Sequence, residues 1–351
     1  MAELLDFVSL SLLPVWCWRV AAEWLRRGDL PGAVLRRLLA ACAPDEPDPA
    51  STIPVQAADA IRRAAAAAIT AVPWSDPSYP VALTTIADPP PVLWTRGRAA
   101  ALSAPAVAIV GSRAASPYAL AVAEQLAGDL AARGLVIVSG LARGVDSAAH
   151  RGALAAGGTT VAVLGSGVDV IYPSEHASLA REIDQDGAVI SELVPGTGPQ
   201  QWFFPLRNRI ISGLSRAVVV IEAGEKSGSL ITARCALDQG RDVLAVPGNV
   251  LSGRNRGAHA LLKDGAKIVE SADDILEELG MGSRAAAPAN SGPADPVLDC
   301  LIPGEASDLD EIAERSGLTP ARLLPRLFEL ELLGRVRRVG GGRFVRIDRT
   351  C

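Results

Sequence analysis

The stretch V-A-I-V-G-S-R, from Val107 to Arg113, decides the fold. Four apolar residues, three of them β-branched, are followed at once by a glycine, a serine and an arginine. Short apolar runs that end in small residues are typical of parallel strands buried on both faces of a sheet. Six further runs of this kind follow: Val136–Val138, Thr160–Leu164, Val189–Ile190, Val218–Ile221, Val243–Val246 and Ile268–Val269.

Amphipathic, alanine-rich segments separate these runs. Strands that alternate with helices predict a parallel sheet that is covered on both faces. We therefore expect residues 73–280 to form a doubly wound, mostly parallel, Rossmann-like α/β domain. The helices are predicted at Tyr118–Arg133, Asp146–Ala156, Ser229–Gln239 and Asp273–Leu279.

An N-terminal helical module is predicted over residues 1–72, of a SAM or helix-hairpin-helix-like kind. Apolar residues recur at helical spacing over Leu30–Ala41 and Ala57–Ala71. An acidic, proline-rich break is expected between them, from Pro44 to Pro54. The pattern favours a packing or dimerisation role, although the turn at Gly28–Gly32 could belong to a helix-hairpin-helix reader of the DNA backbone.

A C-terminal winged-helix-like domain is predicted over residues 296–351, after a flexible linker over 281–295 that is rich in Ala, Pro, Ser and Gly. Its second helix is acidic and its expected recognition helix offers only Arg322 and Arg326 outwardly. Protein docking and weak contact with a nucleic-acid backbone therefore both remain open. The pattern consists of helices at Pro296–Cys300, Leu309–Ser316 and Thr319–Leu333, then two short strands around the Gly340–Gly342 turn.

The composition limits the function. The chain has 351 residues and a formal net charge of -5, so a nucleic-acid site must be a local basic patch whose binding depends on salt. The five cysteines and three histidines show no metal-binding spacing, and Gly165-x-Gly167 lacks the third glycine of a dinucleotide motif. We expect no metal, no other cofactor and no disulfide framework. Neither a signal peptide nor a membrane span is recognisable at the N-terminus, and a reducing cytoplasm is the expected location.

Small polar loops follow five of the predicted strands. In an open parallel sheet, ligands bind at the carboxyl ends of the strands, where loops lead into helix N-termini. The backbone N–H groups and hydroxyls of such loops bind phosphate, although each loop alone is also compatible with an ordinary tight turn. The loops contain Gly111, Ser112, Ser139, Gly140, Gly165, Ser166, Gly167, Ser191, Gly224, Ser227, Gly228 and Ser229.

The stretch F-F-P-L-R-N-R at Phe203–Arg209 adds aromatic and basic residues close to a predicted strand end. Guanidinium groups bind phosphates, and aromatic faces stack on unpaired bases. At least one of Phe203 and Phe204 is expected to be buried beneath the loop. The pattern predicts a site for a polyanion with exposed bases, and its cations are Arg113, Arg143, Arg207, Arg209 and Lys226.

The carboxylates near these loops indicate no catalytic set. Glu192 and Glu222 directly follow strands and could form an acid–base pair, but no nucleophile or metal accompanies them. We expect both to organise loops by accepting hydrogen bonds from the backbone or from arginine. Asp146 is expected to cap its helix, and His150, on the same helix face, to pack or cap.

Six ordered motifs together resemble one known family. They are S-Y-P-V-A-L-T-T-I-A-D-P-P-P-V-L-W-T-R-G (Ser78–Gly97), V-A-I-V-G-S-R (Val107–Arg113), S-G-L-A-R-G-V-D-S-A-A-H (Ser139–His150), F-P-L-R-N-R-I-I-S-G-L-S (Phe204–Ser215), E-A-G-E-K-S-G-S-L-I-T-A (Glu222–Ala233) and V-P-G (Val246–Gly248). The chain resembles the DNA processing protein A family, also called DprA or Smf. The resemblance is close from Pro73 to Gly280 and looser in the last module.

The resemblance implies a protein that binds single-stranded DNA in a basic pocket, forms homodimers, and loads the RecA recombinase onto incoming strands during natural transformation. The chain departs from the family pattern at Ala119 and His259, which lie outside the pocket motifs. By motif position, the resemblance assigns DNA contact to Gly111, Ser112, Arg113, Arg143, Phe204, Arg207, Asn208, Arg209, Ser227, Gly228 and Ser229. We add Ser139, Gly140 and Lys226 from the same loops.

Two other classes of function remain open. The segment from Glu222 to Thr232 is similar to the phosphate loop of the lysine-decarboxylase-like nucleotide phosphoribohydrolases, which share this type of fold. The chain lacks the paired glycines of that loop and has Arg207-Asn208-Arg209 in place of an evident catalytic set. The other class is a purely structural, partner-binding protein with a vestigial site.

Overall fold

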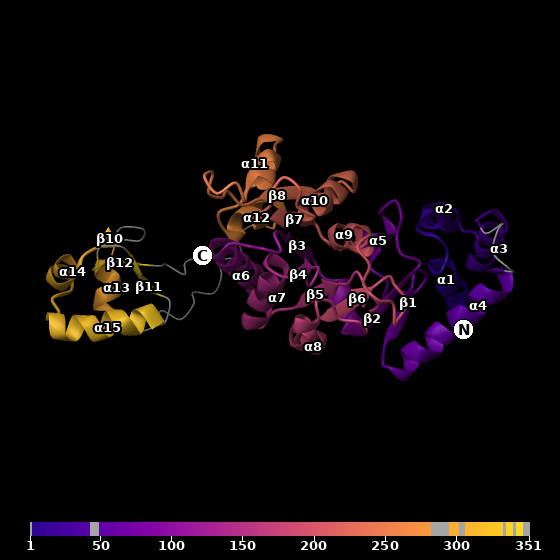
Figure 1. Cartoon of the computed structure of the whole chain (residues 1–351), viewed down its shortest axis with the longest axis horizontal. Helices are drawn as coiled ribbons and strands as arrows, with labels where there is room; N and C mark the ends of the chain where they lie inside the picture. The colour runs from indigo at the N-terminus through magenta and orange to yellow at the C-terminus, as the bar shows by residue number, and fades with distance from the viewer. Residues whose placement is uncertain are drawn as a thin grey trace. The chain divides into compact units, whose positions relative to one another are not determined.

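The structure, a computed structural model, describes residues 2–42, 49–281, 295–301, 306–332, 335–339 and 342–346 (Figure 1). The chain forms two compact units, residues 1–282 and 283–351. Apart from its two end residues, the linker predicted at 281–295 lies outside the described residues. Among the helices described, none has the length and apolar character needed to cross a membrane.

A nine-stranded sheet, counted over the described residues, forms the centre of the first unit. The strand order is β1-β2-β6-β5-β4-β3-β7-β8-β9, and the strands from β3 to β9 pair in parallel. All seven runs predicted from the sequence are confirmed as strands, with ends that differ by at most one residue. These are β3 (Ala106–Val110), β4 (Val136–Ser139), β5 (Thr160–Val163), β6 (Ala188–Ser191), β7 (Ala217–Val220), β8 (Asp242–Ala245) and β9 (Lys267–Ile268).

Two strands at one edge were not predicted. β1 (Thr70–Pro73) pairs with β2 (Val92–Gly97), and β2 pairs with β6, both antiparallel. The prediction of a helix as far as Ala71 is wrong, because the helix ends at Ala66. Strand pairing and the complete burial of Trp94 in β2 override the helical preference of the alanine-rich segment.

Helices cover both faces of the sheet, because successive side chains of a strand point to opposite faces. Val107 and Ile109 share a core with α6 and α7, whereas Ala108 and Val110 share the opposite core with α9 and α10 (Figure 1). The helices predicted at α6, α7, α10 and α12 are confirmed within one residue. The helical elements are α5 (Val81–Thr84), η1 (Ala99–Leu102), α6 (Pro117–Ala132), α7 (Val145–Ala155), η2 (Ser174–His176), α8 (Ala177–Asp186), α9 (Phe203–Leu214), α10 (Ser229–Asp238), α11 (Arg256–Lys263) and α12 (Ala272–Glu278).

The N-terminal helices share one hydrophobic core with the sheet. Leu10 of α1 and Trp94 of β2 are both completely buried in this core. The break predicted from Pro44 to Pro54 is too long, because α4 begins at Pro49 and includes Pro54, while residues 43–48 lie outside the described residues. The described N-terminal helices are α1 (Ala2–Ser11), α2 (Val15–Arg26), α3 (Pro31–Cys42) and α4 (Pro49–Ala66).

The second unit has the winged-helix order of elements. The acidic residues predicted in its second helix have a structural role, since Asp308 and Glu311 form a capping box at the start of α14. A short strand, β10, was not predicted, and residues 340 and 341 of the expected glycine turn lie outside the described residues. The elements are α13 (Pro296–Cys300), β10 (Ala306–Ser307), α14 (Leu309–Ser316), α15 (Pro320–Leu332), β11 (Val336–Val339) and β12 (Arg343–Arg346), with strand order β10-β12-β11.

The shared core predicts that the N-terminal helices and the sheet unfold together. Leu10→Ala should lower the free energy of unfolding of the first unit by about 2–5 kcal/mol, because it leaves a cavity in that core. Urea unfolding of the full chain, followed by circular dichroism, measures this loss. Leu30→Ala is the control, because Leu30 is 75% exposed and its loss should change stability by less than about 0.5 kcal/mol. A separate early transition of the helices alone in Leu10→Ala would contradict the prediction.

Candidate nucleic-acid interface

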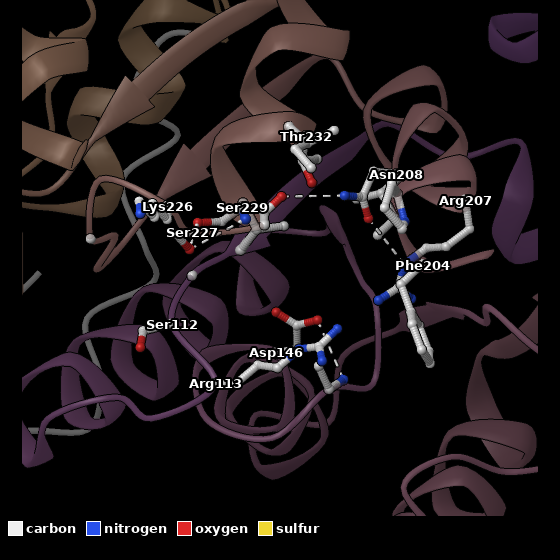
Figure 2. Close-up of a pocket in the computed structure, with 18 of the residues that line it drawn as sticks. Ser112, Arg113, Asp146, Phe204, Arg207, Asn208, Lys226, Ser227, Ser229 and Thr232 are labelled. Atoms are coloured by element: carbon white, nitrogen blue, oxygen red, sulfur yellow. Dashed lines mark hydrogen bonds between the residues drawn. The ribbon is translucent and has the colours of Figure 1, made fainter. Parts of the chain in front are cut away.

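A cavity of about 780 Å³ lies at the carboxyl ends of the central strands. The strand order reverses between β3 and β7, and this switch point is where open α/β sheets bind ligands. Figure 2 shows Lys226, Ser227 and Ser229 on one side of the cavity, and Phe204 and Asn208 on the other. Of the predicted site residues, those that line the cavity are Gly111, Ser112, Arg113, Phe204, Arg207, Asn208, Lys226, Ser227, Gly228 and Ser229.

Four predicted residues lie elsewhere. Gly140 and Arg143 line a small adjoining cavity of about 30 Å³, which shares Arg113, Phe204 and Arg207 with the main one. Ser139 is buried in the sheet, where its hydroxyl donates to the carbonyl of Ile109 at 2.7 Å. Neither Ser139 nor Arg209 is among the residues that line these two cavities.

One end of the cavity is suited to an anion. Helix α10 begins at Ser229 at this end of the cavity, after the N-cap residue Gly228. The turn itself supplies acceptors for its first backbone N–H groups: the Ser227 hydroxyl for Ser229, at 3.4 Å, and the carbonyls of Ser227 and Gly228 for Leu230 and Ile231, both at 3.1 Å. The hydroxyls of Ser227 and Ser229 lie 2.7 Å apart, and the exposed Lys226 precedes them. A helix N-terminus beside an ammonium group and two hydroxyls is a phosphate-binding arrangement.

The opposite wall carries an aromatic pair and a cation. The ring of Phe204 is half-buried, and its centroid lies 5.4 Å from that of Tyr172 and 5.2 Å from Cζ of Arg113. Phe203 is buried and packs against Trp202, with ring centroids 3.9 Å apart. The prediction that at least one of the two phenylalanines is buried is therefore confirmed. Arg113 and Tyr172 are both exposed to solvent and can meet a ligand.

Arg207 is buried, and its guanidinium connects helix α9 to the ends of strands β4 and β5. Its Nη1 donates to the carbonyls of Gly140, at 2.7 Å, and of Val163, while its Nε donates to Asn208 Oδ1 at 3.1 Å. Burial lowers the pKa of Arg207 to about 10, against the opposing charge of Asp146, so the guanidinium is still charged at neutral pH. Arg207 lines both cavities, and its Nη1 and Nε are bound to acceptors of the protein. Its contact with DNA stays a prediction.

Asp146 organises the β4–α7 loop, residues 140–144. One carboxylate oxygen accepts hydrogen bonds from the backbone N–H groups of Gly140, at 3.1 Å, and Ala142, at 3.4 Å. The prediction that Asp146 caps its helix is wrong, because Gly144 occupies the N-cap position. His176 fixes the same loop through a contact of 2.8 Å between its Nδ1 and the carbonyl of Leu141, a residue with a φ of 58°.

Arg209 points away from the cavity. Residues two apart on a helix are separated by about 200° around its axis, so Arg207 and Arg209 of α9 face opposite directions. Arg209 forms ion pairs with Glu192 at 2.7 Å and Asp88 at 2.9 Å, and its Cζ lies 5.6 Å from the centroid of the Trp18 ring. Although burial opposes it, Glu192 and Asp88 raise the pKa of Arg209. The structure thus places this predicted ligand in a buried ion-pair network.

The two carboxylates expected to organise loops do so. Glu192 binds Arg209, and Glu222 accepts hydrogen bonds from the backbone N–H of Ser116, at 3.1 Å, and from its hydroxyl, at 2.6 Å. Neither lines the cavity. Burial lowers the pKa of His150 to about 3, and its Nδ1 lies 2.6 Å from Oγ1 of Thr160. Among the described residues, no three His, Cys, Asp or Glu side chains are grouped as metal ligands would be.

Several lining residues were not recognised as part of the site from the sequence, among them the polar Asp146, Tyr172, Gln201 and Thr232. Tyr172 follows the loop that contains Gly165 and Gly167, and the low aromatic content of 4% could have drawn attention to it. Thr232 lies three residues after Ser229 on α10, so helical spacing places it on the same face. Asp146 offered no such signal, since a carboxylate in a first helical turn usually serves the helix itself.

The buried ion pair of Arg209 yields a prediction on stability. Arg209→Ala should lower the free energy of unfolding by about 3–5 kcal/mol, because it leaves the buried Glu192 without a partner. Urea unfolding measures the loss. Arg98→Ala is the control: Arg98 and Asp186 form an exposed ion pair at 2.9 Å, whose loss should cost at most about 1 kcal/mol. Equal losses in the two variants would show that the Arg209 network is not structural.

Comparison with known proteins identifies the family. Residues 70–280 match the family DNA recombination-mediator protein A, and residues 281–342 match the DprA winged helix domain. The chain is 41% identical over 292 residues to Protein Smf of Escherichia coli, which covers 80% of this chain and 78% of that protein. It is 48% identical over 203 residues to the DNA processing protein DprA of Streptococcus pneumoniae, which covers 58% of this chain and 72% of that protein.

Two solved structures are similar to this one. The X-ray structure of DprA from Streptococcus pneumoniae has a TM-score of 0.65 and 37% identity, covering 78% of this chain and 95% of that one. DprA from Helicobacter pylori, solved to explain its mode of binding single-stranded DNA, has a TM-score of 0.55 and 31% identity, covering 60% of this chain and 95% of that one. On these matches, the chain belongs to the DNA recombination-mediator protein A family, which comprises the DNA-processing proteins named DprA and Smf.

Proposed function

We propose that the chain binds single-stranded DNA in the cavity at the switch point, with phosphates held by cations and helix N-termini and with little sequence preference. The observation that carries the proposal is the combination of the α10 N-terminus, its serine hydroxyls and Lys226 at one end with Arg113 beside the Phe204–Tyr172 pair at the other. Phosphates and unpaired bases both find partners there. The similarity to the Helicobacter pylori protein supports the same function.

The family resemblance supports a wider role that we also propose. The chain acts in the cytoplasm as a homodimer that protects incoming DNA and loads RecA onto it during natural transformation. The winged helix then serves docking more than sequence readout. Arg326 of its recognition helix is engaged with Asp295 and Glu329 within its own unit, which supports this division.

Binding is favoured over nucleotide hydrolysis. Glu222, the acid that follows β7, binds the N-cap residue of α6, Ser116, and does not line the cavity. Asp146 does line the cavity, but its carboxylate organises the β4–α7 loop. These contacts support a binding protein without a catalytic set. Release of free base from a nucleoside monophosphate by the purified protein, abolished by Glu222→Gln, would favour the phosphoribohydrolase alternative instead.

The first prediction from this proposed function concerns the salt dependence of binding and the preference for single strands over duplex. The logarithm of the affinity for oligo-dT should fall linearly with the logarithm of the salt concentration, because phosphate binding releases counterions. A duplex of the same length should bind more weakly, since its stacked bases cannot reach Phe204. Fluorescence anisotropy at several salt concentrations measures both effects. Affinity that is independent of salt, or tighter binding of the duplex, would refute the proposal.

The second prediction separates charge from stacking. Arg113→Ala should weaken binding and reduce the salt slope by about one phosphate contact. Phe204→Ala should weaken binding by about 1–3 kcal/mol with an unchanged slope if the ring stacks on a base. Anisotropy titrations and melting temperatures of both variants are compared with wild type. If Phe204→Ala lowers only the melting temperature, the ring is a packing residue; if Arg113→Ala binds like wild type, Arg113 is not a ligand.

The third prediction concerns Asp146 as a positioning residue. Burial raises the pKa of its carboxyl, although Arg207 and the backbone N–H groups of Ala142 and Gly140 oppose the rise, so a charged carboxylate there costs stability at neutral pH. Asp146→Asn keeps an acceptor for the Gly140 and Ala142 N–H groups and should retain oligo-dT affinity with an equal or higher melting temperature. Asp146→Ala loses the acceptor and should bind more weakly, with an unchanged salt slope. Full affinity in Asp146→Ala would remove the loop from the site.

A further inference from the structure

Two neighbouring apolar side chains are exposed on the loop after β8. Val250 is 77% exposed and Leu251 is 92% exposed, in the β8–α11 loop, residues 246–255. Single exposed apolar residues are common on protein surfaces, but an adjacent pair at a loop tip places most of two aliphatic side chains in water. Packing within the loop does not account for this exposure, which is typical of a surface that binds a ligand or a partner.

The base of this loop is anchored to the rim of the cavity. Nη1 of Arg254 donates to the carbonyl of Ala114 at 2.8 Å, and Oδ1 of Asn255 accepts from the backbone N–H of Ala223 at 3.2 Å. Ala114 itself lines the cavity, and Ala223 precedes another lining residue, Gly224. The tip is therefore held beside the cavity and not at an arbitrary place on the surface.

The turn at the tip is also defined. Oδ1 of Asn249 accepts a hydrogen bond from the backbone N–H of Leu251 at 2.8 Å, and the hydroxyl of Ser252 donates to the carbonyl of Asn249 at 3.1 Å. Side chains of asparagine and serine commonly close turns in this way. The apolar pair thus stands on a closed turn, which lowers the entropy lost when a ligand meets it.

Sheet topology places the loop at the same rim of the sheet as the cavity. β8 is the parallel neighbour of β7, so its carboxyl end opens at the same rim as the loop that carries Lys226. Cations lie at the same place: Arg254 is exposed, and the side chain of Arg256 is 69% exposed, with only a long contact of 3.5 Å to Glu225. Cations next to apolar side chains match a chain of phosphates with unstacked bases.

We propose that the single strand bound in the cavity continues over the β8–α11 loop, with Arg256 at a phosphate and Val250 and Leu251 against the bases. This inference rests on the proposed function, and it extends that site by a segment that only a longer strand can reach. A protein partner would use the apolar pair without the adjacent cavity, and continuity with the cavity favours the DNA strand.

The test compares a short and a long strand on the same variants. The combined change of Val250→Ser and Leu251→Ser should weaken binding of an oligo-dT of about sixteen nucleotides but leave one of about four unaffected. The loss on the long strand should be about fivefold, as partial burial of two aliphatic side chains predicts. Leu30→Ser with Val81→Ser is the matched control, since Leu30 and Val81 are 75% and 78% exposed and lie outside the cavity lining.

Charge gives a second, independent readout. Arg256→Ala should lower the salt slope for the long strand by about one and leave that for the short strand unchanged. Arg98→Ala, an arginine with a side chain 65% exposed, should change neither slope. Unchanged affinity and slope for the long strand in both loop variants would overturn the extension while leaving the cavity site intact. A wild-type protein that bound neither strand would overturn the proposed function together with the extension.

Discussion

The buried guanidinium of Arg207 is the interaction on which the site depends. It comes from helix α9 and donates to the carbonyls of Gly140 and Val163, at the carboxyl ends of β4 and β5, so one side chain joins a helix to two strands. Glycine at position 140 leaves room for this guanidinium, because a Cβ atom there would lie 2.1 Å from Nη2 of Arg207 and would displace it. A buried guanidinium without these acceptors would be costly, so the loop and the arginine stabilise each other.

The basic residues at and near the site have different roles, depending on whether they are exposed or buried. Arg113 and Lys226 are exposed at the cavity and can exchange hydration water for phosphate, whereas the buried Arg207 is already bound to protein acceptors. Arg209 is buried as well, and it connects α9 to Glu192, Asp88 and the ring of Trp18. A cation contributes to binding of an anion only if its donors are available in the folded state, so a count of basic residues overstates the number of phosphate contacts.

The N-terminal helices are part of the same physical unit as the site. Trp18 of α2 lies over Arg209, and the core that contains Leu10 continues into β2, β5 and β6. Helix α9 is thus held from the cavity side by Arg207 and from the opposite side by the contacts of Arg209.

The α/β class, the seven strands of the parallel part of the sheet, the winged-helix order and ten of the residues that line the cavity could be predicted from the sequence alone. Those features depend on local patterns, since short β-branched runs favour strands and amphipathic segments favour helices wherever they occur. Tertiary structure alone decided the rest. β1 and β2 form through strand pairing. Phe203–Arg209 lies in helix α9, where Arg207 faces the cavity and Arg209 forms a buried ion pair. Residues two apart look equivalent in a sequence, but a helix places them on opposite sides, and only the surrounding carbonyls and carboxylates decide which of them a ligand can reach.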